Sequence, residues 1–293
     1  MIKAYSWLTL CVVIWGSNFV FGKMLIQYFS PTMLTELRLF FIVLFLVGLA
    51  AIKKEFRRVN KIDLMLLFVL GVVGVFINQW SFFAGLQTAD PTTAALILAT
   101  TPILAGVLAA LFLKEKFTIR MLIGSVIAIV GIYSVVTKGE FVAIAVDSGL
   151  LWIVVTMVTF AIMIIMTRVL SKRVSPLTIT LYSNIIGFAV GVPFIAVLDH
   201  PIRVSTDLSD WTFLIGTAIV VHGIAALIWN QNIRYVDASK ASILSNLEPF
   251  VAMLMGLILL YKPVTKVELL GSLLIIGGVV LSTFQRNIKV RSE

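Results

Sequence analysis

The stretch TADPTTAALILATTPILAGVLAALFLKEKFT, residues 88–118, is matched by YVDASKASILSNLEPFVAMLMGLILLYKPVT, residues 235–265. The two stretches align without a gap, and the residues that interrupt their apolar runs fall at the same places. The matched positions here and just beyond are Asp90 and Asp237, Pro102 and Pro249, Gly124 and Gly271, and Gly131 and Gly278. The chain is therefore predicted to be a duplication, with one copy at residues 1–143 and the second at residues 144–293.

The composition places both copies in a membrane. Hydrophobic residues make up 60% of the 293-residue chain and charged residues only 13%, whereas soluble domains run nearer 45–50% and about 25%. A spanning helix needs about 20 mostly apolar residues, and backbone in hydrocarbon must satisfy its own hydrogen bonds. Ten segments qualify, near residues 5–23, 32–52, 63–86, 91–113, 119–137, 149–170, 177–197, 211–234, 239–261 and 267–286. The sequence predicts an all-α integral membrane protein with ten transmembrane helices.

Five spans in each copy is an odd number, so the second copy is predicted to cross the membrane in the opposite sense to the first. The expected architecture is two inverted five-helix repeats. Inverted repeats of this kind place a substrate site at the repeat interface near the membrane midplane, and they work by alternating access.

Lysine and arginine gather in one set of alternate loops, the set that shares a side with both chain ends. Cytoplasmic loops carry the excess of these residues, so both termini are predicted to be cytoplasmic in a multi-pass protein of the plasma membrane. The same asymmetry accounts for the net charge of +9 without a nucleic-acid partner.

Several residues at the span starts fit helix caps. Ser30-Pro31, Asp90-Pro91 and Ser175-Pro176 match an N-cap followed by proline at the first helical position. Thr265 and Glu268 fit a capping box. The repeated glycines in the fifth and tenth spans predict close helix packing or a dimer face, which leaves a homodimer open.

The two copies resemble EamA modules of the drug/metabolite transporter superfamily over nearly the whole chain. The matching segments are WGSNFVFGK (15–23), LRLFF (37–41), TTPILAGVLAALFLKEK (100–116) and SNLEPFVAMLMGLILL (245–260). The resemblance implies an EamA-like five-helix repeat in each copy, a central cavity lined by spans 1, 3, 4, 6, 8 and 9, and peripheral spans 5 and 10. Such modules usually end spans 4 and 9 with a glycine–glutamate pair. This chain has Lys114-Glu115 in the first copy and Tyr261-Lys262 in the second, so a role for that glutamate carries over to Glu115 at most.

The segment NLEPF, residues 246–250, puts an amide and a carboxylate in the ninth span. Glu248 lies roughly 13 Å from the inner end of that span, near the middle of a ~30 Å core. Ionisable groups at this depth are functional candidates, so Glu248 is either a coupling carboxylate for protons or a hydrogen-bonding group at a kink made by Pro249. Asn246 is rotated about 200° from Glu248 around the helix, and we expect Asn246 to face the substrate.

Arg38 lies roughly 9 Å below the outer end of the second span by helix rise. One interpretation is that its side chain snorkels outward to the membrane surface. The alternative is an anion-attracting site or a charge partner for Glu248.

Other polar and aromatic residues inside the spans are candidates for substrate binding, because ligand pockets combine apolar walls with a few orienting polar groups. Interhelical packing and hydrogen bonding is the alternative for each of them. The candidates are Trp15, Asn18, Asn78, Trp80, His222, Trp229 and Asn230, together with Asn246.

No GxxxxGK[ST], HExxH or GxSxG motif occurs in the sequence, so we expect no enzyme activity, no ATP-driven motor, no metal and no cofactor. The predicted function is a secondary transporter of small metabolites, with export of amino acids or related amphiphilic compounds as the first choice. A noncatalytic channel or scaffold is the alternative, and amines, nucleobases or sugars are alternative substrates. Proton coupling remains open.

Overall fold

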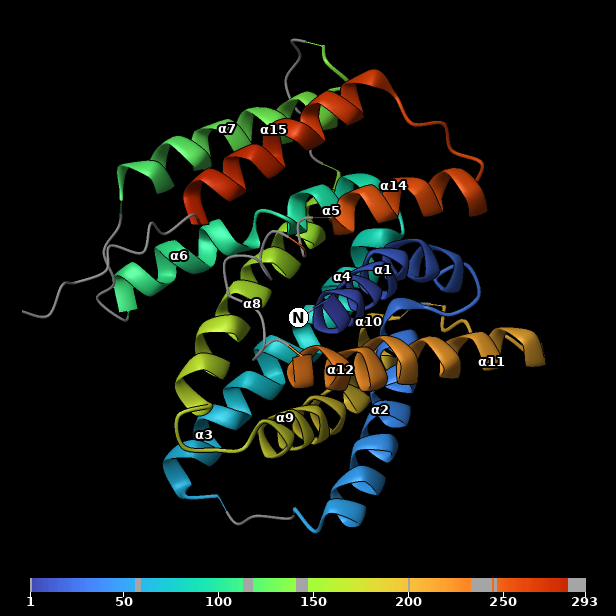
Figure 1. The fold of residues 1–293 in the computed structure, drawn as a ribbon. Coiled ribbons are helices and arrows are strands. Elements are labelled where there is room, and N and C mark those ends of the chain that lie inside the picture. The colour runs from blue at the N-terminus through green and yellow to red at the C-terminus, as the bar shows by residue number, and fades with distance from the viewer. Residues whose placement is uncertain are drawn as a thin grey trace, which may run out of the picture.

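The computed structural model describes residues 2–55, 59–112, 118–140, 147–199, 201–232, 244 and 247–283, and within them every element is helical (Figure 1). The first copy contains α1 (Ile2–Leu25), α2 (Pro31–Lys53), α3 (Lys61–Val69), η1 (Leu70–Ile77), α4 (Asn78–Leu86), α5 (Pro91–Leu98), α6 (Thr101–Phe112) and α7 (Ile119–Val136). The second contains α8 (Ser148–Leu170), α9 (Pro176–Gly191), η2 (Val192–Phe194), α10 (Ile195–Leu198), α11 (Leu208–Thr217), η3 (Ala218–Ile224), α12 (Ala225–Asn232), α14 (Glu248–Leu259) and α15 (Lys266–Thr283).

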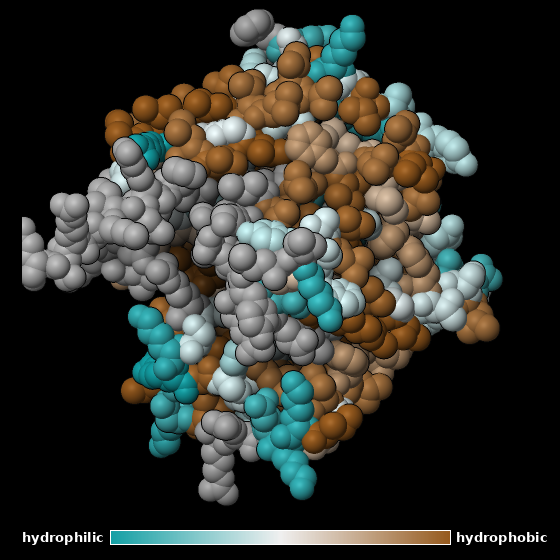
Figure 2. All heavy atoms as spheres, in the orientation of Figure 1, coloured by the Kyte–Doolittle hydropathy of each residue, from teal (hydrophilic) through white to brown (hydrophobic). Residues whose placement is uncertain are grey.

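In the described part of the chain, seven helices are long and apolar enough to cross a membrane. They are Lys3–Leu25, Pro31–Lys53, Lys61–Leu86, Pro91–Phe112, Ile119–Val136, Ser148–Thr167 and Pro176–Leu198. Two shorter apolar helices, Leu208–Ile224 and Glu248–Leu259, add to them. Figure 2 shows hydrophobic side chains over the outer faces of α7 and α15, a surface suited to lipid. The prediction of an all-helical membrane protein is confirmed at this level.

The duplication is visible in the helix boundaries. The alignment that pairs Asp90 with Asp237 also pairs both ends of α6 with those of α14, and both ends of α7 with those of α15. It also pairs the last residues of η1 and η3, Ile77 and Ile224, and places their first residues within one position of each other. Both segments are π-helical, with one extra residue in the turn. Equivalent sequence positions in the two copies therefore produce equivalent local structure, including its irregular parts.

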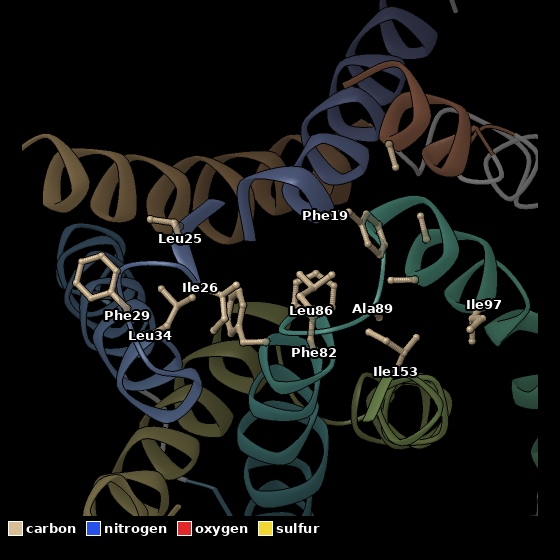
Figure 3. Packing of buried hydrophobic residues seen from close by; sticks show 14 of the residues in the cluster. Phe19, Leu25, Ile26, Phe29, Leu34, Phe82, Leu86, Ala89, Ile97 and Ile153 are labelled. Atoms are coloured by element: carbon tan, nitrogen blue, oxygen red, sulfur yellow. The ribbon is translucent and has the colours of Figure 1, made fainter. Parts of the chain in front are cut away.

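The largest apolar core joins the two copies. Its side chains come from α1, α2, α4 and α5 of the first copy and from α8, α11 and α14 of the second (Figure 3). Within it, the rings of Phe19 and Phe82 meet edge to face with centroids 5.4 Å apart, an arrangement worth about 0.5–1.5 kcal/mol beyond burial. This core fixes α1 against α4, and α1 carries several of the polar residues discussed below.

Helices α7 and α15 lie side by side at one edge of the molecule (Figure 1). A Cβ added at Gly131 would come within 2.7 Å of Ile275 Cγ1 and 2.8 Å of the Gly271 carbonyl oxygen. One added at Gly278 would collide with the carbonyl oxygen of Gly124. The predicted close packing at the repeated glycines is therefore confirmed, and the glycines of one copy face those of the other within a single chain.

The predicted caps form at most of the expected positions. The side chains that accept or exchange hydrogen bonds with the first turn are Asp90 for α5, Ser175 for α9, and the reciprocal Thr265–Glu268 pair for α15. These residues are therefore structural, as their spacing indicated.

The prediction that the Ser30 side chain caps α2 is wrong. It occupies the N-cap position of α2, but its side chain makes no capping hydrogen bond. The carboxylate of Asp199, from the far end of α10, takes that role: it accepts hydrogen bonds from the backbone N–H groups of Thr32 and Met33 at 3.1 and 2.9 Å. The hydroxyl of Ser30 donates to the same carboxylate. The cap therefore joins the first copy to the second, which local sequence patterns do not reveal.

Replacing Asp199 by alanine is expected to lower the midpoint of thermal unfolding, because it removes a buried cap worth about 1–2 kcal/mol. The matched control is Asp207→Ala, since Asp207 is exposed at the N-cap of α11 and makes no capping bond. Thermal unfolding of purified protein in detergent measures both. Equal midpoints for the two variants would show that the Asp199 contact contributes little.

Lys262 stands at the end of the ninth span, where EamA modules usually have a glycine–glutamate pair, and it makes two ion pairs. Its ammonium lies 2.8 Å from an Asp90 oxygen and 2.6 Å from a Glu268 oxygen, the capping residues of α5 and α15. Partial burial lowers the pKa of Lys262, but the hydrogen bonds to Asp90 and Glu268 outweigh that effect and raise the pKa above its usual value. Lys262 therefore links the N-terminus of α5 in the first copy to the N-terminus of α15 in the second.

Candidate functional site

The fourth predicted span is broken in two. Helix α5 ends at Leu98 and α6 begins at Thr101, so the expected span over 91–113 is present as Pro91–Phe112, with a two-residue interruption at Ala99 and Thr100. Pro102 has no N–H for the carbonyl of Leu98, four residues earlier. The Thr101 hydroxyl donates to that carbonyl at 2.6 Å instead, which satisfies the oxygen that the break leaves free.

The ninth span has the equivalent helix start. Helix α14 begins at Glu248, which the duplication pairs with Thr101, and Pro249 follows as Pro102 does. Both prolines therefore occupy the second position of a helix. Residues 245 and 246, just before α14, lie outside the described part of the chain, so the expected kink at Pro249 stays a prediction. A helix N-terminus carries a partial positive charge, and half-helices that start within a membrane commonly face a transported anion.

Helix α1 packs directly against the start of α14. A Cβ at Gly16 would lie 2.8 Å from the carbonyl oxygen of Glu248 and 2.6 Å from Cβ of Val251. Glycine at this position therefore lets the backbones of the two helices touch. The side chain of Glu248 is only partly buried, and among the described residues no ion pair joins it to Arg38.

Arg38 is fully buried, and the interpretation that it snorkels outward is wrong. Its Nη1 donates to Thr217 Oγ1 at 2.7 Å, and its Nη2 lies 3.2 Å from Asn18 Oδ1 and 3.1 Å from His222 Nδ1. The guanidinium also lies over the ring of Phe83, 5.4 Å from its centroid, a cation–π arrangement. Three acceptors and an aromatic face hold the charge inside the bundle.

Two of the predicted tryptophans meet beside this group. The rings of Trp15 and Trp229 have centroids 4.9 Å apart, and Trp15 Nε1 donates to the carbonyl of Val221 at 3.1 Å. The side chain of Asn230, the next residue of α12, and the whole of Asn246 lie outside the described residues, so they remain predictions.

Asn78 and Trp80 make their polar contacts with α8 and α2. Asn78 Nδ2 donates to the carbonyl of Thr156 and to Thr159 Oγ1, both at 2.9 Å, on α8. Trp80 Nε1 donates to Thr32 Oγ1 at 3.0 Å, and its ring packs against a tryptophan of α8. These contacts match the interhelical alternative stated for both residues.

Several neighbours of the candidate residues were not singled out from the sequence. Thr217 and Phe83 complete the surroundings of Arg38, and neither belongs to a polar pattern on its own helix. Glu36 is also buried, and neither of its carboxylate oxygens has a hydrogen-bond partner among the described residues. It packs onto Gly191, where a Cβ would collide with its Oε1 and with the ring of Phe76. The glycine at position 191 is the sequence signal for this contact, because a residue without a Cβ leaves room for another side chain.

The structure thus brings Asn18, Arg38 and His222 together with the Trp15–Trp229 pair, drawing on α1 and α2 from the first copy and on η3 and α12 from the second. Such a group at the interface of two copies, with apolar rings beside hydrogen-bonding groups, has the composition of a small-molecule site. Among the described residues no group of His, Cys, Asp and Glu could hold a metal ion.

The chain is similar to known proteins in sequence and in fold. The uncharacterized transporter YyaM of Bacillus subtilis is 28% identical over 276 residues, covering 92% of this chain and 89% of YyaM. An uncharacterized transporter of Archaeoglobus fulgidus is 28% identical over 295 residues, covering 97% of this chain and 100% of that protein. One solved crystal structure superposes with a TM-score of 0.64 at 16% identity, over 94% of this chain and 95% of the other, which shows a shared fold.

The model of the EamA-like transporter family matches this chain twice, over residues 2–137 and 147–284. The two matches together span most of the chain, and each falls on one copy of the duplication. The chain therefore belongs to the EamA-like transporter family.

Proposed function

We propose that this protein is a secondary transporter that moves small metabolites across the cytoplasmic membrane by alternating access, with export of amino acids or related amphiphilic compounds. The observation that carries the proposal is the pair of helix starts at Thr101 and Glu248, at matching positions of the two copies. Broken helices at the interface of repeats are the usual substrate-binding elements of secondary transporters.

The proposed architecture has ten spans in two inverted five-helix repeats, residues 1–143 and 144–293, with both termini in the cytoplasm. The repeated helix boundaries and the two family matches support the division. The odd number of spans per copy and the placement of lysine and arginine support the inversion and the orientation. Rocking of one repeat against the other would expose the interface to each side in turn.

The proposed substrate site is lined by residues of both copies. Trp15 and Trp229 supply aromatic walls, and Asn18 and His222 supply hydrogen-bonding groups, all four being only partly buried. Asn230 and Asn246 are proposed to complete the site. Asn78 and Trp80 are proposed at its margin, since their polar atoms also bond to neighbouring helices.

Counterflow in proteoliposomes tests the carrier mechanism. Vesicles are loaded with a radiolabelled amino acid, diluted, and exposed to the same unlabelled amino acid outside. A carrier is expected to release label faster in the presence of external substrate, because loaded sites reorient in both directions. Vesicles without protein serve as the control.

A channel gives a different result in the same assay. Label then leaves down its own gradient, and external substrate makes no difference to the rate. That outcome contradicts alternating access and favours a channel. Amines, nucleobases and sugars are run in parallel, so that the assay also ranks the substrate classes.

A further inference from the structure

The protonation pattern around Arg38 follows from the chemistry of its guanidinium, which donates hydrogen bonds and accepts none. Because Arg38 Nη2 lies 3.1 Å from His222 Nδ1, that nitrogen must act as the acceptor and carry no proton. The ring proton of a neutral His222 then resides on Nε2. By the same reasoning the atom of Asn18 that faces Arg38, at 3.2 Å, is its oxygen, so its NH₂ group points away from the guanidinium.

The nitrogens of Asn18 and His222 that do not contact Arg38 are therefore both hydrogen-bond donors. Asn18 Nδ2 and His222 Nε2 have no acceptor among the described residues, and both side chains are only partly buried. Two N–H donors beside a full positive charge form the complement of a carboxylate, which accepts at both oxygens.

The charge of Arg38 is also unbalanced within the described part of the chain. A buried charge is costly unless a counter-charge accompanies it, and the acceptors bonded to Arg38 are all neutral. Glu36, two residues away on α2, turns to Gly191 instead. Glu248 lies at the start of α14 and forms no ion pair with Arg38. Among the described residues, the site therefore lacks one negative charge.

We propose that the Asn18–Arg38–His222 cluster binds the carboxylate of the transported substrate. The Trp15–Trp229 pair lies beside it, because Trp15 bonds to the carbonyl of Val221, the residue before His222. The substrate is thus an amphiphilic carboxylate, with its acid group on the cluster and its apolar part against the rings. This inference rests on the proposed transport function and narrows it to carboxylates, excluding simple amines, nucleobases and sugars.

The first test uses ligand-induced thermal shifts of purified protein, since a ligand that binds the native state raises its apparent stability. The probes are the common amino acids, the carboxamide of each one that binds, phenethylamine, adenine and glucose. Amino acids with apolar side chains are expected to raise the midpoint, whereas their carboxamides, the amine, the nucleobase and the sugar do not. Equal shifts for an acid and its carboxamide, or shifts only for uncharged or cationic probes, overturn the proposal, as does the absence of any shift from a carboxylate.

Asn18→Asp gives the sharpest variant. The new side chain has the same shape, and it supplies Arg38 with the carboxylate oxygen that it lacks while removing the donor NH₂. The variant is expected to fold with a midpoint no lower than that of the unaltered protein, because Arg38 gains a counter-charge. It is expected to bind the selected amino acid about tenfold to a hundredfold more weakly, as for a lost hydrogen bond to a charged group. The control Gln87→Glu adds the same charge at an exposed position and is expected to bind normally. Unaltered affinity in Asn18→Asp contradicts the proposal.

His222 provides a second, independent pair of variants. Glutamine can accept from Arg38 with its oxygen and donate outward with its NH₂, so His222→Gln is expected to keep binding within a few fold. His222→Leu loses both groups and is expected to lose binding. Equal affinities for these two variants would contradict the proposed role of His222 as a donor. If His222→Leu does not fold, Asn18→Asp still tests the proposal.

Counterflow separates this inference from the transport proposal. If carboxylates bind but show no counterflow, the cluster is supported as a carboxylate site and the transport proposal is rejected. Counterflow of amines or sugars that carboxylates do not inhibit upholds transport and rejects the cluster as a carboxylate site.

Discussion

Replacing Gly278 by leucine is expected to prevent α7 and α15 from packing, and therefore to leave little folded protein. A Cβ at this position collides with the carbonyl oxygen of Gly124 and lies 2.7 Å from the backbone nitrogen of Ala128. Backbone atoms cannot rotate aside as a side chain can, so the two helices must separate along their length. Overpacking costs about 1–3 kcal/mol and occasionally more, and here the neighbouring Gly131–Gly271 contact is lost as well.

The matched control for this variant is Gly277→Leu. Gly277 is the preceding residue of the same helix, it is exposed, and no atom lies within 4 Å of a Cβ built there. Its substitution is expected to leave the unfolding midpoint unchanged, so the pair separates the helix contact from helix propensity. Yield of monodisperse protein and thermal unfolding in detergent measure both variants. Similar behaviour of the two would show that close contact between α7 and α15 is unimportant.

The helical membrane architecture could be predicted because its signals are local and repeated. Apolar runs of the length of a bilayer and a gapless internal match need no knowledge of tertiary contacts. The caps at Asp90, Ser175 and Thr265 were also predictable, since each acts on the backbone two or three residues away. Ser30 was the exception, because its helix is capped by Asp199, more than half the chain away in sequence.

The broken helices could be predicted only in part. A proline in a long apolar run indicates a missing hydrogen bond, and we expected a kink at Pro249. Whether a helix bends or stops depends on what satisfies the free carbonyl. In the first copy the hydroxyl of Thr101 supplies that hydrogen bond, and the helix ends before it.

The surroundings of Arg38 show why depth along a helix is a poor guide to a side chain's direction. Its acceptors come from α1, α11 and η3, so no local pattern joins them. Thr217 and His222 are five residues apart, about 140° around a regular α-helix. The π-helical segment η3 begins directly after Thr217 and contains His222, and its wider turn brings both side chains toward one guanidinium. The irregular segment is therefore part of how the cluster is built.

If Glu248 couples protons to transport, replacing it by glutamine is expected to abolish substrate movement driven by a pH gradient while leaving exchange of labelled for unlabelled substrate intact. Glutamine resembles the protonated carboxylic acid but can never release a proton, so a carrier that couples through this group loses its driving ion and retains its substrate site. Placement at the first residue of α14 supports the coupling role. The helix N-terminus there stabilises the charged form of the carboxyl group.

Glu36→Gln is the matched control, because Glu36 is a carboxyl group of α2 that is buried against Gly191. Proteoliposomes with an imposed pH gradient, and the same vesicles without one, give the driven and exchange rates for each variant. Normal driven transport in Glu248→Gln would reject its coupling role. A lower unfolding midpoint with both rates reduced together would instead assign Glu248 to the structure of the helix start. Loss of driven transport in Glu36→Gln alone would identify Glu36 of α2 as the coupling group. Only a carboxyl group that gains and loses a proton in each transport cycle can affect the driven rate without affecting the exchange rate.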